Sequence, residues 1–184
     1  MTLLSGKRGL ILGVANENSA AWGIAQQAYK LGAKLAFTYQ MPAFKKRLAP
    51  LAESVESDLL IECDVNEELA AKETIEVLSS HWTEIDFVVH SLGFSDKNEL
   101  RGPYYDTSRE NFKKTMLISA FSFTELAQAS FPLMPKGGSL LTLSYLGGVR
   151  TTPNYNVMGV AKAALEASVR ITVHNEVKFI FRLC

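Results

Sequence analysis

The chain has 184 residues, of which 47% are hydrophobic and 21% are charged, as in an ordinary globular protein. Nineteen basic residues balance nineteen acidic ones, so charge gives no reason to expect nucleic acid or a membrane as partner. No apolar run reaches the ~20 residues that span a bilayer, and the first residues lack the apolar stretch of a signal peptide. Cys63 and Cys184 match no metal-ligand spacing. We expect a soluble, cytoplasmic protein with free cysteines and no metal.

Short apolar runs alternate with helical patterns along the whole chain. We predict six strands, at residues 9–13, 34–39, 58–63, 86–92, 139–144 and 177–181. The predicted helices cover residues 19–31, 43–54, 66–82, 107–127 and 155–170. This alternation indicates right-handed crossovers and a parallel sheet with helices on both faces, a doubly wound α/β fold. Such a sheet binds ligands beyond the carboxyl ends of its strands, near the switch in strand order.

Local signals mark the starts of several predicted helices. Ser19 is the expected N-cap of the first helix, and Gly23 is expected to let that helix lie close to the sheet. Asn66 is the expected cap of the third helix. Thr107 and Glu110 have the spacing of a capping box that opens the fourth.

The turn between the first strand and the first helix favours a bound pyrophosphate. Gly13 ends the strand and Ser19 opens the helix, whose N-terminus offers unpaired N–H groups and a partial positive charge. The GxGxxG fingerprint is absent, and Glu17 and Ser19 stand where two glycines of the common short-chain dehydrogenase motif would be. A strand–turn–helix with no ligand is therefore the alternative.

The end of the second strand bears on the choice of cofactor. A dinucleotide fold usually places an acidic residue there to hold the adenosine ribose. Here the residue is Gln40, which can hydrogen-bond a hydroxyl but cannot neutralise a phosphate, and residues 38–43 include no Arg or Lys. This favours NADH over NADPH. Lys45, Lys46 and Arg47 are expected on a solvated helix face, with a contact to a 2′-phosphate as the alternative.

The segment after the fifth strand carries the strongest chemical signal. Tyr145 follows the strand, Tyr155 begins a helix, and Lys162 lies two helical turns later on the same face as Tyr155. Reduction of a conjugated thioester puts negative charge on the thioester oxygen, which a phenol can stabilise in a water-poor site. A nearby ammonium supports charge on that hydroxyl network and can hold the nicotinamide ribose. His90, inside an apolar strand, is expected to be structural.

These motifs, in this order, resemble those of the enoyl-acyl carrier protein reductase family, a divergent branch of the short-chain dehydrogenases. The resemblance runs from about residue 4 to residue 170. It is carried by residues 13–24, 37–40, 63–65, 90–94, 143–147 and 153–162. The decisive detail is the Tyr-x6-Lys spacing of Tyr155 and Lys162, because most short-chain relatives use Tyr-x3-Lys and Gly159 occupies that position here.

The resemblance implies NADH-dependent reduction of the trans-2 double bond of enoyl-acyl carrier protein thioesters in fatty acid synthesis. The family's catalytic roles would fall on Tyr145, Tyr155 and Lys162. Its cofactor site would comprise Gly13, Ser19, Ala20, Gln40, Asp64, Val65, Ser91, Leu92, Gly93 and Lys162. Its acyl pocket would be lined by Phe94, Tyr145 and Met158. A single Rossmann-type domain over residues 1–184, a homotetramer, and an acyl carrier protein that delivers the substrate are also implied.

The sequence after residue 170 departs from the family pattern. Family members continue into a sixth strand, a segment that covers the substrate and a seventh strand, which residues 171–184 do not match. We therefore expect an incomplete domain without the last strand and the covering segment, and with little activity of its own. Two alternatives stay open. One is a different short-chain oxidoreductase acting on a ketone or alcohol, and the other is a non-catalytic remnant that binds a nucleotide or partner subunits.

Overall fold

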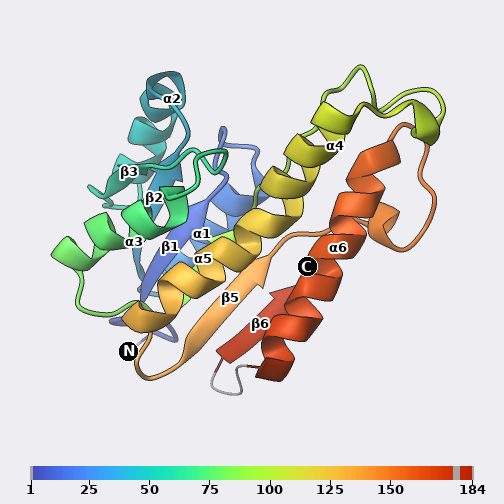
Figure 1. Ribbon diagram of the computed structural model, residues 1–184. Helices are drawn as coiled ribbons and strands as arrows, with labels where there is room; N and C mark the ends of the chain where they lie inside the picture. Colours follow the sequence, from blue (N-terminus) through green and yellow to red (C-terminus); the bar gives the residue numbers. More distant parts are fainter. Residues whose placement is uncertain (1, 176–178, 184) are drawn as a thin grey trace.

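The computed structural model describes residues 2–175 and 179–183, and it contains one six-stranded parallel sheet. The strands are β1 (Arg8–Leu12), β2 (Lys34–Tyr39), β3 (Leu60–Glu62), β4 (Phe87–His90), β5 (Gly138–Thr142) and β6 (Phe179–Leu183). Their order in the sheet is β3-β2-β1-β4-β5-β6 (Figure 1). The predicted parallel α/β fold is confirmed. Val177, with which the predicted sixth strand begins, lies outside the described residues.

Helices cover both faces of this sheet. They are α1 (Ala20–Lys30), α2 (Pro42–Glu53), α3 (Ala70–His81), α4 (Arg109–Met116), α5 (Ser122–Ser130) and α6 (Asn156–Asn175). One apolar core joins the sheet to α3, α5 and α6, with Leu78, Phe123 and Leu165 among its fully buried members. The second core joins the other face to α1 and α2 through residues such as Trp22 and Leu48. Figure 1 shows α3, α5 and α6 in front of the strands.

The strand order reverses between β1 and β4, and this places a crevice at their carboxyl ends. β1 leads to β2 on one side, whereas β4, which comes later in the chain, pairs with β1 on the other side, with Leu12 opposite His90. In a doubly wound sheet this switch point is where ligands bind. The residues just beyond Leu12 and His90 are therefore the first place to look for a site.

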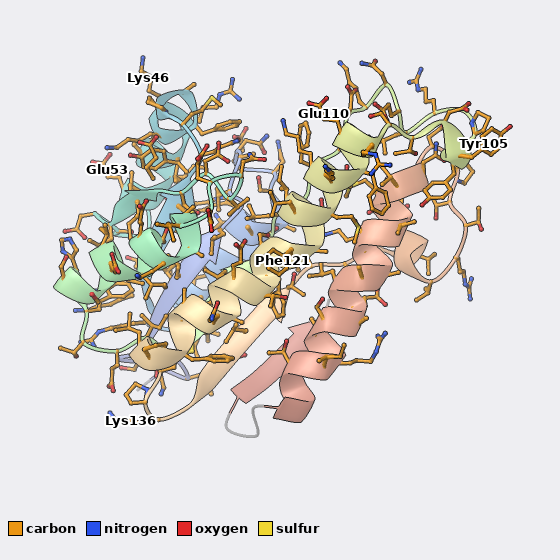
Figure 2. The ribbon with its side chains drawn as sticks, viewed as in Figure 1. Lys46, Glu53, Tyr105, Glu110, Phe121 and Lys136 are labelled. Atoms are coloured by element: carbon orange, nitrogen blue, oxygen red, sulfur yellow. The ribbon has the colours of Figure 1, made fainter. Side chains whose placement is uncertain are left out.

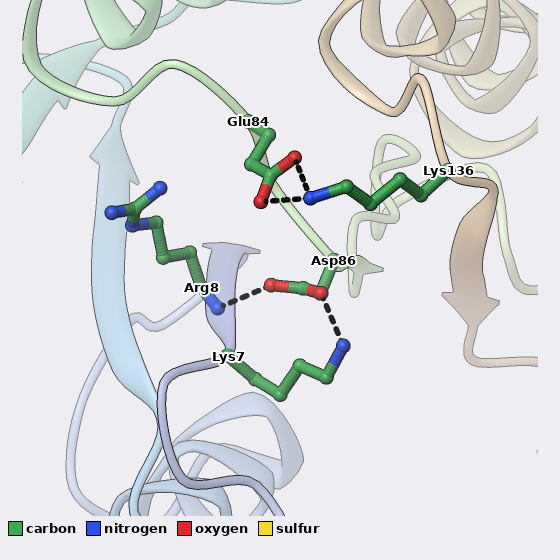
Figure 3. Close-up of polar contacts among 5 residues, drawn as sticks. All are labelled: Lys7, Arg8, Glu84, Asp86 and Lys136. Atoms are coloured by element: carbon green, nitrogen blue, oxygen red, sulfur yellow. Dashed lines mark hydrogen bonds and ion pairs between the residues drawn. The ribbon is translucent and has the colours of Figure 1, made fainter.

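The opposite edge of the sheet, where the strands begin, carries ion pairs (Figure 3). Lys7 Nζ lies 2.7 Å from Asp86 Oδ1, and the Arg8 backbone N–H donates to the other oxygen of Asp86 at 2.9 Å. Lys136 Nζ lies 2.9 Å from Glu84. Exposed pairs of this kind each contribute little to stability, but they tie the starts of β1, β4 and β5 together.

A π-helical segment, Leu117–Phe121, interrupts the predicted continuous helix between α4 and α5. The wider turn lets two serines of one helical rod reach different partners. Ser119 Oγ accepts from the Phe94 backbone N–H at 2.9 Å, and Ser122 Oγ bonds to His90. Such segments are rare and frequently occur at functional sites. The rod thus contacts the segment that leaves β4 at two places.

Two local predictions about helix starts are wrong. The N-cap of α4 is Ser108, whose Oγ accepts from the Asn111 backbone N–H at 3.1 Å, so Thr107 and Glu110 form no capping box. Asn66 does not cap α3, because the helix begins at Ala70 with Leu69 at the N-cap position, and the N–H groups of Asn66 donate to Asp64 instead. These corrections have one cause: several neighbouring residues can cap a helix, and tertiary partners decide which one does.

Gly23 is also not explained by close packing. A Cβ built at this position would meet no atom within 4 Å, so α1 does not need a glycine there to approach the sheet.

Cys63 is buried and forms no disulfide, and Cys184 lies outside the described residues. Within residues 2–175 and 179–183, no helix is both long and apolar enough to cross a membrane.

Candidate active site

The turn after β1 brings its backbone very close to the end of β4. Gly13 has a φ of +92°, and a Cβ there would fall 1.9 Å from the Ser91 carbonyl oxygen, so only glycine fits. Ser19 is the N-cap of α1, as expected, but its Oγ accepts from the backbone N–H groups of Ala15 and Asn16 rather than from the helix. The Ser19 carbonyl accepts from the Trp22 N–H at 2.9 Å, so Ser19 shapes the turn and leaves the N–H groups of Ala20 and Ala21 for another acceptor.

A cavity of about 330 Å³ lies at the switch point. It is lined by eight of the predicted site residues, from four separate segments: Gly13, Gln40, Asp64, Val65, Ser91, Leu92, Gly93 and Phe94. Ser19 and Ala20 are not in this lining, and Ala20 instead borders a separate groove of about 880 Å³ along α1. The structure thus brings together the segments after β1, β2, β3 and β4, as the predicted topology requires.

Asp64 is the centre of a polar cluster in the cavity wall. Its Oδ2 accepts from Gln40 Nε2 at 3.1 Å, and its Oδ1 accepts from the backbone and side-chain N–H groups of Asn66. Partial burial opposes the charge of this carboxylate, but the hydrogen bonds from Asn66 and Gln40 outweigh it and lower the pKa of Asp64. Asp64 is therefore an ionised acceptor at neutral pH, suited to a hydroxyl or amine group of a ligand.

The three cations that follow β2 are exposed, as expected, but two of them lie beside the cavity. Lys45 Nζ is 5.3 Å from the centre of the Tyr39 ring, and the Arg47 guanidinium is 5.9 Å from that of Phe44. Both rings line the cavity. Lys46 points away from the body of the molecule (Figure 2). Positive charge thus lies nearer to the cavity than the sequence indicates.

His90 is buried and fully hydrogen-bonded, which confirms that it is structural. Ser122 Oγ donates to the Ile118 carbonyl, so it must accept from His90 Nε2–H, at 2.8 Å. Thr142 Oγ1 then donates to His90 Nδ1, also at 2.8 Å. Burial, together with the charge of Lys162, lowers the pKa of His90 to about 3. The ring is therefore neutral and holds β4, β5 and the helical rod together.

Lys162 lies at the junction of β4, β5 and α6. Its side chain is only 7% exposed, and Nζ donates to the carbonyl oxygens of Leu143, at 2.9 Å, and Leu92, at 3.4 Å. Burial lowers the pKa of this ammonium. Gly93 lies beside it, since a Cβ on Gly93 would be 3.7 Å from Nζ. Lys162 is thus fixed at the edge of the segment that lines the cavity.

Tyr145 and Tyr155 face each other where β5 leads into α6. Their ring centres are 4.8 Å apart, and the ring planes are tilted by 57°. Partial burial, with a smaller contribution from Tyr145, raises the pKa of Tyr155, so this phenol keeps its proton at neutral pH. It can donate a hydrogen bond to an oxygen that gains negative charge, as an oxyanion donor must. Neither tyrosine is in the lining of the 330 Å³ cavity.

The two predicted apolar walls differ in exposure. Phe94 is 44% exposed in the cavity lining, with Lys114 Nζ 4.9 Å from the centre of its ring. Met158 is buried, and a Cβ on Gly93 would lie 3.5 Å from its terminal methyl group. Phe94 is therefore available to a ligand, whereas Met158 supports Gly93 from behind.

Four residues that line the cavity were not expected to do so: Phe44, Asn66, Lys114 and Ile118. Lys114 and Ile118 come from α4 and the π segment, and their spacing of four residues puts them on one helix face. That spacing is visible in the sequence, but nothing in the sequence says that this face meets the cavity.

Comparison with known proteins agrees with this geometry. The family model described as "Enoyl-(Acyl carrier protein) reductase" matches residues 13–175. The chain belongs to the enoyl-acyl carrier protein reductase family. It is 58% identical, over 168 residues, to an NADH enoyl-acyl carrier protein reductase of Rhizobium meliloti, a match that covers 91% of this chain and 63% of the relative. The chain therefore spans less than two thirds of that family member's length.

Solved structures of the family have the same fold. The enzyme of Anaplasma phagocytophilum, in complex with NAD, is 51% identical with a TM-score of 0.92, over 95% of this chain and 66% of that one. The enzyme of Bacillus cereus, in complex with NADP⁺ and an indole naphthyridinone, is 40% identical with a TM-score of 0.96, over 100% of this chain and 73% of that one. Family members thus crystallise with either dinucleotide.

Proposed function

We propose that this chain carries the cofactor-binding and catalytic core of an NADH-dependent enoyl-acyl carrier protein reductase. The reaction is the reduction of the trans-2 double bond of an enoyl thioester in fatty acid synthesis. The observation that carries the proposal is the placement of Tyr155 and Lys162 beside the carboxyl ends of β4 and β5, in a member of this family. The acyl carrier protein, a homotetramer and the cytoplasm are the partner, assembly and location that we propose with it.

The residues of the site fit a dinucleotide. The close backbone approach at Gly13 leaves a side-chain-free cradle next to the N-terminus of α1, where a pyrophosphate is favourably bound. Asp64 and Gln40 offer polar groups to the adenosine. Lys162 would hold the nicotinamide ribose, and Gly93, which has no side chain and lies beside Lys162 Nζ, would let the cofactor pass.

NADH, when bound, supplies the hydride that the β-carbon of the double bond accepts. The chain's own residues stabilise the charge that results. The phenol of Tyr155 donates a hydrogen bond to the thioester oxygen, which becomes an enolate oxygen. Tyr145, whose ring packs on that of Tyr155, lines the acyl pocket and keeps water from the phenol.

The test follows NADH absorbance with a short trans-2-enoyl thioester and, in parallel, with the matched 3-oxoacyl thioester. We expect turnover of the enoyl thioester only, at the low rate already expected for this chain, and a higher kcat/KM with NADH than with NADPH. Turnover of the 3-oxoacyl thioester alone would make the chain a ketone reductase. NADH binding without turnover of either substrate would instead make it a binding module.

A further inference from the structure

A hydrogen bond between Ser144 and Glu166 joins the end of β5 to α6, and neither residue has a role so far. Ser144 Oγ donates to Glu166 Oε1 at 2.6 Å, the short distance typical of a hydroxyl that donates to a carboxylate. Both residues are half-buried. One helical turn earlier, Lys162 Nζ donates to the carbonyl of Leu143. Two successive turns of α6 therefore bind two consecutive residues of the chain that leaves β5.

Glu166 also contacts the other end of the same short segment. A Cβ built on Gly148 would lie 3.0 Å from Glu166 Oε1, so this oxygen packs against the backbone of Gly148. The Gly148 N–H in turn donates to the Tyr145 carbonyl at 2.8 Å. Glu166 thus touches the residue before Tyr145 and the residue that closes the turn after it.

The side chain of Tyr145 has few means of holding its own position. It is 51% exposed, and its ring contact is with Tyr155. The orientation of Tyr145 therefore depends on the backbone of residues 144–148, which Glu166 holds at both ends.

We propose that Glu166 is a positioning residue that acts through Ser144 to hold Tyr145 against Tyr155 and the acyl pocket. The proposal rests on the proposed function, because it is the enoyl substrate that Tyr145 would contact. Removal of the bond leaves the Lys162–Leu143 contact in place. Turnover should therefore fall while the affinity for NADH is kept.

The experiment measures kcat and KM of Ser144→Ala, Glu166→Ala, Glu166→Gln and the double variant Ser144→Ala/Glu166→Ala. Misplacement of a substrate-contacting group by about 1 Å can cost up to 10²-fold, so we expect kcat to fall about 10-fold in each alanine variant, with KM for NADH unchanged. Glu166→Gln should retain part of the turnover, because its amide oxygen still accepts from Ser144. The double variant should be no slower than the slower single variant, since all three lose the same bond.

Ser168→Ala is the matched control. Ser168 lies on α6 and is also half-buried, but its Oγ donates to the Ala164 carbonyl within the helix. It should keep wild-type kcat. Wild-type kcat in the two alanine variants, additive losses in the double variant, or a loss confined to KM for NADH would each overturn the proposal.

Amide hydrogen exchange separates this proposal from the proposed function. Exchange at Gly148 and Val149, whose N–H groups bond within the turn, should speed up in Ser144→Ala and Glu166→Ala but not in Ser168→Ala. If the wild-type chain did not turn over the enoyl thioester, the proposed function would be refuted. The amide exchange rates of the variants would then still show whether Glu166 holds the backbone around Tyr145. Unchanged exchange at these two amides would refute the positioning itself.

Discussion

At the scale of single residues, the hydroxyl group of Tyr155 offers the most direct test of the proposed function. The pKa of this phenol is raised, chiefly by burial, so the group is a donor throughout the neutral range. Loss of one oxyanion donor typically lowers kcat by ~10²–10³, and we expect this for Tyr155→Phe, with little change in KM for NADH.

Tyr105→Phe is the control for this prediction. Tyr105 is 84% exposed and lies in the short 3₁₀ helix Tyr104–Asp106 (Figure 2), so the loss of its hydroxyl should have no effect. If Tyr155→Phe kept wild-type kcat with several enoyl thioesters, another group would have to be the donor.

His90 predicts a specific loss of stability in acid. Its pKa in the folded chain is about 3, below the ordinary value of 6.5, so between these two pH values the unfolded chain binds a proton that the folded chain does not. The stability that comes from keeping His90 neutral is complete above pH 6.5 and declines as the pH falls. The decline is about 1.4 kcal/mol per pH unit.

Urea unfolding at several pH values between neutrality and mild acid measures this slope. His90→Gln, which cannot titrate, should show a flatter dependence than the wild type, even if it is less stable overall. His81→Gln, on the exposed end of α3, should keep the wild-type slope. Identical slopes for all three chains would mean that His90 does not remain neutral in the folded state.

At the scale of elements, the start of α4 tests which of two neighbours is the cap. Ser108 Oγ accepts from the Asn111 N–H and donates to Glu99, whereas Thr107 Oγ1 donates to the Tyr104 carbonyl in the preceding turn. Loss of an N-cap typically destabilises by about 1 kcal/mol, so Ser108→Ala should lower the free energy of unfolding by that amount. Thr107→Ala should lower it by less. The reverse order in urea titrations would restore Thr107 as the cap.

The elements also show what sequence reasoning can reach. The alternation of apolar runs and helical patterns predicts the strands and the parallel sheet. It also predicts the edge at which Gly13, Gln40 and Asp64 meet, because these predictions need only local patterns and one rule of sheet topology. The choice of Ser108 over Thr107 depends on Glu99, nine residues away, which no local pattern records.

The π segment escaped prediction for a similar reason. Met116 and Phe123 are seven residues apart, which is about two α-helical turns, so the apolar pattern reads as one continuous helix. The wider turn at Leu117–Phe121 instead accompanies the contacts of Ser119 with Phe94 and of Ser122 with His90. These partners are distant in sequence, so the pattern within the helix contains no trace of them.

At the scale of the whole molecule, a ligand that contacts more of the site should bind more tightly. At equal concentration it should therefore raise the free energy of unfolding by more. NADH at 100 times its Kd should add about 2.7 kcal/mol to the free energy of unfolding, and the Tm should rise accordingly. AMP, which lacks the nicotinamide ribose, should bind more weakly and raise the Tm less at equal concentration. Lys162→Ala should reduce the NADH effect towards that of AMP.

Lys136→Ala provides the comparison in the same thermal melts. Lys136 pairs with Glu84 at the edge where the strands begin (Figure 3), so its loss should leave the NADH-induced rise in Tm unchanged. A rise in Tm with NADH that was the same for Lys162→Ala and the wild type would show that Lys162 does not hold the cofactor.

The common direction of the six strands has a practical consequence for this molecule as a surface-bound reagent. A five-residue strand such as β5 is about 16 Å long, so the cavity and the ion-paired edge face opposite ways. The side chain of Lys136, at that edge, is 79% exposed. A thiol introduced by Lys136→Cys, in a chain whose Cys184 is replaced by serine, could anchor the chain to an electrode or bead while Cys63 stays buried. Every anchored molecule would then present its cavity to the solution, in a single orientation that the strands themselves impose.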